Sequence, residues 1–203
     1  MILEQIQYIT RDDENFSHSQ QAEIMFEQGI KLVQLRMKNA SRDEIVEESQ
    51  KAILYANRFN SRVIINDSVE IAKEVNAHGV HLGLNDMPVD EARNVLGKDI
   101  IIGGTANTVE HVFFQIKKGV DYVGMGPFKY TLTKENLSPI IGLHGYSEIV
   151  DQLKQRKIKI PVFAVGGIAL NDIKELQKVG IKHVAISKGL WDKYKPIELY
   201  KRN

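Results

Sequence analysis

Four segments of the chain share one hydrophobic pattern: a glycine, then Ile or Val, then a short apolar run. Each follows an amphipathic stretch with the polar and apolar spacing of a helix. Short β-branched runs of this kind are typical of buried parallel strands. We expect each glycine to end the preceding helix, because glycine adopts the left-handed conformation at no steric cost. The four segments begin at Gly29, Gly79, Gly119 and Gly180.

The spacing of these glycines predicts further strands between them. Each interval is long enough for about two strand–helix units, since one unit needs roughly 25–30 residues. Apolar runs suited to strands lie at 6–10, 62–67, 99–104 and 161–167. The pattern therefore predicts eight strands in all.

Helical stretches alternate with these strands. Residues 42–59 follow Ser41, and Glu44 stands three positions later, which is a capping-box pattern. Eight alternating units favour an α/β fold with parallel strands, a single (β/α)8 TIM barrel over residues 1–203, and a doubly wound open sheet is the alternative. The other predicted helices are near 18–28 and at 68–76, 88–96, 108–118, 145–156, 170–179 and 189–200.

Composition narrows the functional classes. The 203 residues are 43% hydrophobic and 26% charged with a formal charge of +1, which argues against disorder, general nucleic-acid binding and attachment to a membrane surface. The sequence has no cysteine, so disulfides and cysteine-held metals are excluded. We read no signal peptide and no bilayer-spanning run, and we expect a cytoplasmic protein.

Basic and amide side chains follow the second strand. In a barrel of this kind the active site lies at the carboxyl ends of the strands. Gln34, Arg36 and Lys38 alternate, so their side chains share one face. Arginine binds phosphate through two parallel hydrogen bonds and lysine acts as a point charge. The alternative is a strand running into a solvated loop with ordinary surface charges.

Two carboxylates follow the third and fourth strands. Asp67 comes after Asn66 at the end of a buried run, and Asp86 lies in the next strand's loop. Mg²⁺ takes one or two protein carboxylates and completes its shell with water and phosphate oxygens. Helix capping is the alternative for both, because each precedes a predicted helix.

The last two strands end in small residues. A phosphate site built from the loops after strands 7 and 8 recurs in this fold, and Gly166, Gly167 and Ser187 lie there. A tight turn is the alternative for the glycine pair. The longest irregular stretch is 127–143, and loops of that length are often functional. We interpret His81 as a core histidine with a satisfied partner rather than an acid–base group.

Eight short motifs, in this order and over nearly the whole chain, resemble the thiamine-phosphate synthase family. Thr105 stands where that family commonly has serine. The motifs are VQLRMK (33–38), INDSVEIAKEVNAHGVHLGLNDMP (65–88), IIGGTANT (101–108), GVDYVGMGP (119–127), TLTK (131–134), GL (142–143), AVGGI (164–168) and AIS (185–187).

The resemblance implies a (β/α)8 barrel that joins a hydroxymethylpyrimidine pyrophosphate to a thiazole phosphate, with Mg²⁺, releasing pyrophosphate and giving thiamine phosphate. It implies catalytic roles for Arg36, Lys38, Thr105 and Lys134, and it places Mg²⁺ on Asp67 and Asp86. The pyrimidine pyrophosphate would contact Gln34, Arg36, Lys38, Asn66 and Lys134; the thiazole phosphate would contact Thr131, Thr133, Gly167, Ile186 and Ser187; Leu35, Met37, Thr105, Leu132 and Gly166 complete the expected substrate-binding set.

Other functions remain open at this point. A thiazole tautomerase would keep the phosphate site but would not need a site for metal and pyrophosphate. A non-catalytic barrel that binds a phosphorylated ligand would bind without turnover. In each case the expected partners are small molecules, with no nucleic acid and no membrane.

Overall fold

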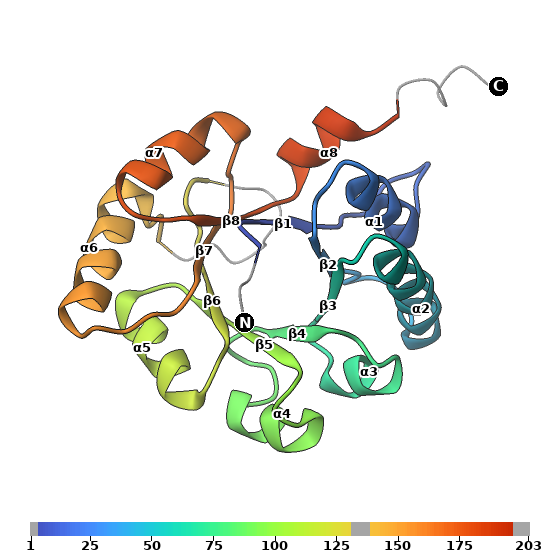
Figure 1. Ribbon diagram of the computed structural model, residues 1–203, viewed down its shortest axis with the longest axis horizontal. Helices are drawn as coiled ribbons and strands as arrows, with labels where there is room; N and C mark the ends of the chain where they lie inside the picture. Colours follow the sequence, from blue (N-terminus) through green and yellow to red (C-terminus); the bar gives the residue numbers. More distant parts are fainter. Residues whose placement is uncertain (1–3, 131–138, 197–203) are drawn as a thin grey trace.

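The computed structural model describes residues 4–130 and 139–196 and contains a closed barrel of eight parallel strands. Each strand pairs with its neighbour in the chain, and β8 closes the ring on β1. Figure 1 shows this ring with the helices around it. The (β/α)8 prediction is confirmed. The strands are β1 (Ile6–Ile9), β2 (Leu32–Leu35), β3 (Arg62–Asn66), β4 (Gly79–Leu82), β5 (Ile101–Ala106), β6 (Tyr122–Met125), β7 (Val162–Val165) and β8 (His183–Ile186).

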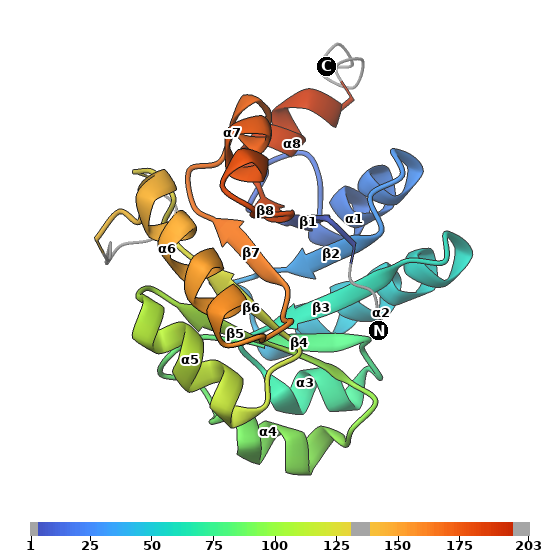
Figure 2. The same cartoon turned by 60° about the vertical axis from the view of Figure 1, so that its left-hand side comes forward.

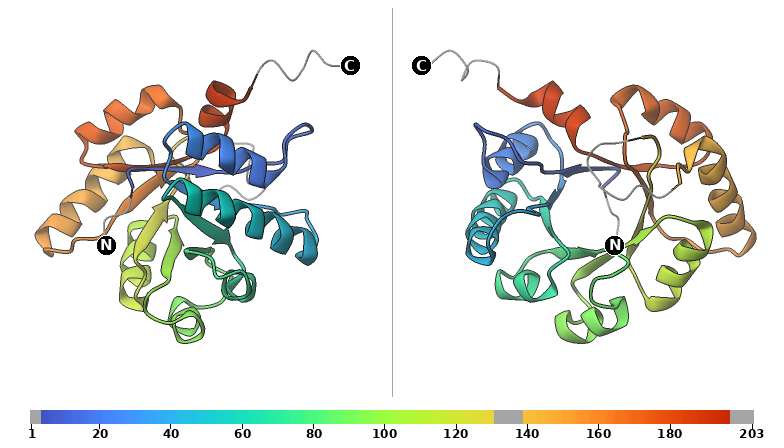
Figure 3. Two further views of the ribbon diagram at one scale, coloured as in Figure 1. Left: turned by 45° about the vertical axis from the view of Figure 1, so that its right-hand side comes forward. Right: turned by 180° about the vertical axis from the view of Figure 1, so that it is seen from behind.

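A helix follows each strand and covers the outside of the ring, as the views in Figures 2 and 3 show. The capping box predicted at Ser41 and Glu44 is present at the start of α2. The helix predicted at 170–179 is in fact a short 3₁₀ turn followed by α7. The helices are α1 (His18–Glu27), α2 (Arg42–Arg58), α3 (Val69–Glu74), α4 (Val89–Leu96), α5 (Val109–Lys118), α6 (Gly142–Gln155), η1 (Leu170–Asp172), α7 (Ile173–Lys178) and α8 (Lys188–Tyr194).

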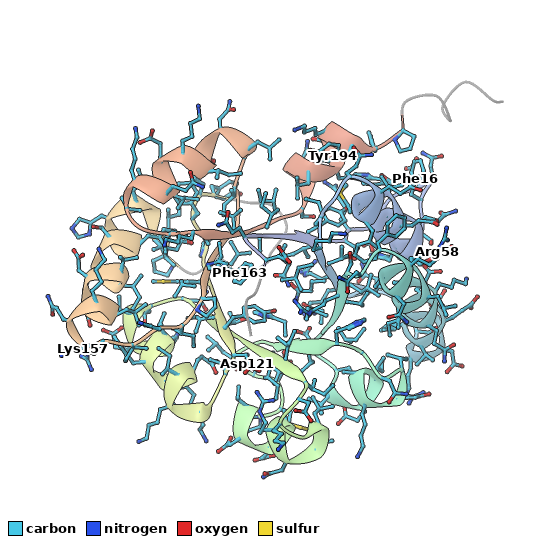
Figure 4. The ribbon with its side chains drawn as sticks, in the orientation of Figure 1. Phe16, Arg58, Asp121, Lys157, Phe163 and Tyr194 are labelled. Atoms are coloured by element: carbon cyan, nitrogen blue, oxygen red, sulfur yellow. The ribbon has the colours of Figure 1, made fainter. Side chains whose placement is uncertain are left out.

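Alternation along the strands divides their side chains between two cores. Every second residue faces the barrel axis, and its neighbours face the helices. Val33, Ile65 and Val123 belong to the outer core beneath the helices. Figure 4 labels Phe163, one of the inner residues, at the inner side of the ring of strands. The inner core consists of Leu32, Ile64, Ile101, Tyr122, Phe163 and Ala185.

The expectation that Gly79 ends a helix is wrong. Gly79 lies inside β4, and Asn76 takes the left-handed conformation after α3, with φ of 52°. A Cβ on Gly79 would lie 2.6 Å from the carbonyl oxygen of Ile101, so this glycine serves close packing between neighbouring strands. The expectation is confirmed by positive φ at Gly29, Gly119 and Gly180.

Two further glycines make room for rings inside the barrel. A Cβ on Gly103 would lie 2.2 Å from Cζ of Tyr122, and a Cβ on Gly124 would lie 2.8 Å from Cε1 of His81. Gly103 pairs with His81 on one side and with Tyr122 on the other. The two rings therefore meet across a strand position that has no side chain, with their centroids 5.5 Å apart.

We predict that Gly103→Ala destabilises the protein by about 1–3 kcal/mol, because the new methyl group overlaps a buried ring. The free energy of unfolding, measured by urea denaturation, checks this. Combining the substitution with Tyr122→Leu removes the overlapping ring. The two changes should then be non-additive by at least about 0.5 kcal/mol. Additive losses would show that the ring is not the obstacle.

Candidate functional site

Polar side chains gather where β2 and β3 end, on positions that face the barrel axis. Gln34 is buried, and its Nε2 donates to Oδ1 of Asn66 at 2.9 Å. Arg36 follows on the same face of the chain, two residues beyond Gln34. The predicted amide of β2 therefore contacts the predicted amide of β3, and Arg36 continues the same row.

The two predicted carboxylates lie together beside a lysine. Nζ of Lys38 is 2.6 Å from Oδ2 of Asp67. Burial raises the pKa of Asp86, and a hydrogen bond and charge repulsion from Asp67 add to this rise, while the Gly83 amide and the Lys38 charge oppose it. The two carboxyl groups therefore lie close enough to interact, with the Lys38 ammonium beside Asp67.

Helix capping does not explain either carboxylate. Ser68 is the N-cap of α3, and its hydroxyl accepts from the Ile71 amide. α4 begins after Pro88, where no side chain caps the helix. Asp86 instead accepts from the Gly83 amide at 2.6 Å and closes the turn after β4. The capping alternative is therefore wrong for both residues.

The backbone at Asp67 helps to fix this arrangement. Asp67 has φ of 67°, a left-handed conformation that aspartate adopts more readily than most side chains. Its amide donates to the carbonyl oxygen of His81 at 2.8 Å. The end of β3 is thereby tied to β4, the strand whose loop carries Asp86.

Thr10, directly after β1, holds the Arg36 backbone, and His18, the first residue of α1, contacts the same hydroxyl; the sequence pattern predicts neither contact. The Arg36 amide donates to Oγ1 of the buried Thr10 at 3.0 Å, and the same hydroxyl lies 2.7 Å from Nδ1 of His18. Burial lowers the pKa of His18, opposed by the nearby Asp12 carboxylate. Applying the strand-end rule to the first strand would have found Thr10.

The glycine pair after β7 contacts the segment that follows β6. The amides of Phe128 and Lys129 donate to the carbonyl oxygen of Gly166 at 3.1 and 3.0 Å. A Cβ on Gly167 would lie 2.8 Å from the carbonyl oxygen of Tyr130. Ser187 lies next to this turn in the fold, at the end of the neighbouring strand β8. The turn after β7 therefore packs against the segment that follows β6.

Several predicted site residues have side chains away from the barrel mouth or lie outside the described part of the chain. The Leu35 and Ile186 side chains are buried in the outer core, so only their backbone groups can face a ligand at the barrel mouth. Met37 lies between Arg36 and Lys38 beyond the end of β2. Thr131, Leu132, Thr133 and Lys134 lie outside the described residues.

His81 has partners on both ring nitrogens, as expected for a core histidine. Its Nε2 is 3.0 Å from Oγ1 of Thr105, and its Nδ1 is 3.1 Å from the hydroxyl of Tyr122. Thr105, a predicted site residue, is therefore part of a hydrogen-bonded group inside the barrel. The sequence could predict that His81 has a partner but not which one.

Residues 4–130 and 139–196 contain no group of three or more His, Asp or Glu side chains placed to hold a metal ion. Within the same ranges, every helix is too short or too polar to cross a membrane.

Comparisons with known proteins show which family the chain is similar to. Residues 6–190 match the family model described as thiamine monophosphate synthase. A thiamine-phosphate synthase from Phocaeicola vulgatus is 43% identical over 183 residues, covering 90% of this chain and 88% of the relative. One from Bacteroides fragilis is 43% identical over 197 residues, covering 97% of each chain. The solved structure of a thiamine phosphate pyrophosphorylase from Pyrococcus furiosus has a TM-score of 0.79 at 30% identity and covers 90% of this chain and 85% of that chain.

We predict that Thr10→Val costs about 1–3 kcal/mol in unfolding free energy, because the Arg36 amide loses its acceptor. Hydrogen exchange of the Arg36 amide, followed by NMR, should become faster. Thr10→Ser is the matched control, since it keeps the hydroxyl and should keep the amide protected. Equal protection in the valine variant would show that the hydroxyl does not hold the end of β2.

Proposed function

The chain belongs to the thiamine monophosphate synthase family, and we propose that it joins 4-amino-2-methyl-5-(diphosphooxymethyl)pyrimidine to a thiazole phosphate, releasing pyrophosphate and giving thiamine phosphate. This makes it a transferase. The observation that carries the proposal is the group at the ends of β2, β3 and β4, where Lys38, Asp67 and Asp86 lie together. A pyrophosphate with its counter-ion needs cationic and carboxylate groups in this combination.

The carboxylate pair fits a magnesium ion. Burial, reinforced by the neighbouring Asp67, raises the pKa of Asp86, and the Lys38 ammonium group lies 2.6 Å from Asp67. Two carboxylates are sufficient, because Mg²⁺ fills its remaining positions with water and phosphate oxygens. When bound, the ion would neutralise charge on the departing pyrophosphate.

The cationic residues would stabilise the leaving group. In the proposed reaction the bond between the pyrimidine methylene carbon and the pyrophosphate oxygen breaks, and the oxygen keeps the electron pair. The amino-substituted ring delocalises the resulting positive charge, so no side-chain nucleophile is needed. Arg36 would bind the pyrophosphate through its planar fork, with Lys38 and Lys134 as point charges.

The second substrate would bind at the other side of the barrel mouth. We propose that the turn at Gly166 and Gly167, with the end of β8 at Ile186 and Ser187, binds the thiazole phosphate. Ile186 would contribute through its backbone, since its side chain is buried in the outer core. Holding the thiazole nitrogen about 3–3.5 Å from the methylene carbon lets its lone pair form the new carbon–nitrogen bond. Roles for Thr131, Leu132 and Thr133 at this phosphate stay predictions.

The proposal also includes the domain organisation, the partners and the location of the protein. The closed barrel supports one domain over residues 1–203. Small phosphorylated molecules are the proposed partners, and the cytoplasm stays the predicted location. The carboxylate pair argues against the tautomerase alternative, which has no use for a site for metal and pyrophosphate.

The direct test mixes the purified protein with both substrates and Mg²⁺ and measures pyrophosphate release. We expect turnover, whereas a non-catalytic barrel would bind the substrates and release none. Chelator treatment should abolish turnover, and added Mg²⁺ should restore it. Full activity after chelation would contradict the metal assignment.

We predict that Asp67→Ala and Asp86→Ala each lower turnover by at least about a hundredfold, because a metal worth several kcal/mol would be lost. Circular dichroism should show an intact fold. Asp90→Ala is the matched control, because Asp90 pairs with Lys118 at 2.6 Å on the outside of the barrel. It should leave turnover unchanged. A loss as large in Asp90→Ala would mean that the assay reports stability instead.

We predict that Arg36→Ala lowers kcat by about 100–1,000-fold, the usual effect of removing one preorganised charge stabiliser. Arg36→Lys should recover only part of this, because the planar fork is lost. Arg58→Ala on α2, whose partner Glu23 lies outside the barrel, serves as the control. Steady-state kinetics near the wild-type values in Arg36→Ala would remove Arg36 from the leaving-group site.

A further inference from the structure

Four side chains from four strands form a hydrogen-bonded chain inside the barrel. Nε2 of Gln7 on β1 lies 3.4 Å from the hydroxyl of Tyr122 on β6. That hydroxyl is 3.1 Å from Nδ1 of His81 on β4, and Nε2 of His81 is 3.0 Å from Oγ1 of Thr105 on β5. This hydrogen-bonded series runs from the buried Gln7 to Thr105, a predicted site residue.

The barrel has space for this chain only because two strand positions lack side chains. Gly103 lies between His81 and Tyr122 in the strand register, and Gly124 lies beside Thr105. An added Cβ would overlap the Tyr122 ring in the first case and the His81 ring in the second. The two rings are therefore held by both packing and hydrogen bonds.

The donor and acceptor groups of these four side chains assign a direction to each hydrogen bond. The Gln7 amide donates to the Tyr122 oxygen, so the single hydroxyl hydrogen of Tyr122 is available to Nδ1 of His81. Burial raises the pKa of Tyr122 well above its ordinary value, which keeps that hydrogen in place. With Nδ1 as an acceptor, a neutral imidazole carries its proton on Nε2 and donates it to Oγ1 of Thr105.

We propose that His81 is a positioning residue that holds the Thr105 hydroxyl as a hydrogen-bond donor toward an acceptor atom of the pyrimidine pyrophosphate. Because Thr105 accepts from His81, its own hydroxyl hydrogen is left for a different acceptor. Pyrophosphate oxygens and pyrimidine ring nitrogens are acceptors, and a hydroxyl fixed as a donor suits them. The identity of this ligand rests on the proposed function. The donor and acceptor assignment of the hydrogen bonds rests on Gln7, Tyr122 and His81.

The first experiment measures the tautomer of His81 in the free protein. Long-range ¹H–¹⁵N correlation NMR on labelled protein, well above the usual histidine pKa, distinguishes a proton on Nε2 from one on Nδ1. His81→Gln removes one set of signals and so assigns it. We expect the proton on Nε2 in the wild type and a mixture in Tyr122→Phe. A proton on Nδ1 in the wild type would overturn the proposal.

The second experiment asks whether Tyr122 and His81 act through Thr105. Tyr122→Phe and His81→Leu should each lower kcat/KM for the pyrimidine pyrophosphate by about tenfold to a hundredfold, the effect of one hydrogen bond to a charged group. In a Thr105→Val background, each should change kcat/KM by less than about twofold. His81→Gln should retain more activity than His81→Leu, because its amide can still donate to Thr105.

The outcomes separate this proposal from the proposed function. Losses that persist in the Thr105→Val background would overturn it, because His81 and Tyr122 would then act independently of Thr105. If Tyr122→Phe does not fold, the His81→Gln and His81→Leu pair and the wild-type tautomer still decide it. A wild type that shows the Nε2 tautomer but releases no pyrophosphate would refute the proposed function while confirming the direction of the chain.

Discussion

The whole structure depends on filling the interior of a ring of short parallel strands. Each strand has four to six residues, so only two or three of its side chains face the axis. On β2 these are Leu32 in the inner core and Gln34 above it, and Arg36 continues the same row beyond the strand. The barrel core and the floor of the candidate site are therefore successive layers of one packed column. A substitution that alters the packing of one layer therefore also shifts side chains of the other.

The fold could be predicted because its signals are local. Four glycine-led apolar segments and four apolar runs in the intervals between them predict all eight strands, and Ser41 with Glu44 predicts the start of α2. The prediction for Gly79 is wrong because a glycine before a strand can serve either a helix end or close packing. Only the position of Ile101 on the next strand decides between them. The capping alternative for Asp67 is wrong because two neighbouring residues can each cap a helix. Ser68, next to Asp67, is the residue that caps α3.

The candidate site was partly predictable. The rule that sites lie at strand ends located the carboxylates and the amides, and the structure brings Lys38, Asp67 and Asp86 together. The same rule extends to Thr10, which directly follows β1 and contacts the Arg36 amide. The partners of His81 could not be predicted, because Thr105 and Tyr122 come from other strands and their contact depends on barrel register. Sequence patterns identify which residues face the axis, and closure of the ring decides which of them touch.

The empty position at Gly103 has an evolutionary consequence. Because an added methyl group there would overlap the ring of Tyr122, substitutions at these two sites are epistatic: the effect of one depends on the residue at the other. A lineage that gains a side chain at 103 must reduce the ring at 122 in the same step or pass through a destabilised intermediate. Losing that ring would also break the contact with His81. Descendants of this sequence should therefore retain or lose Gly103, Tyr122 and His81 as one inherited unit.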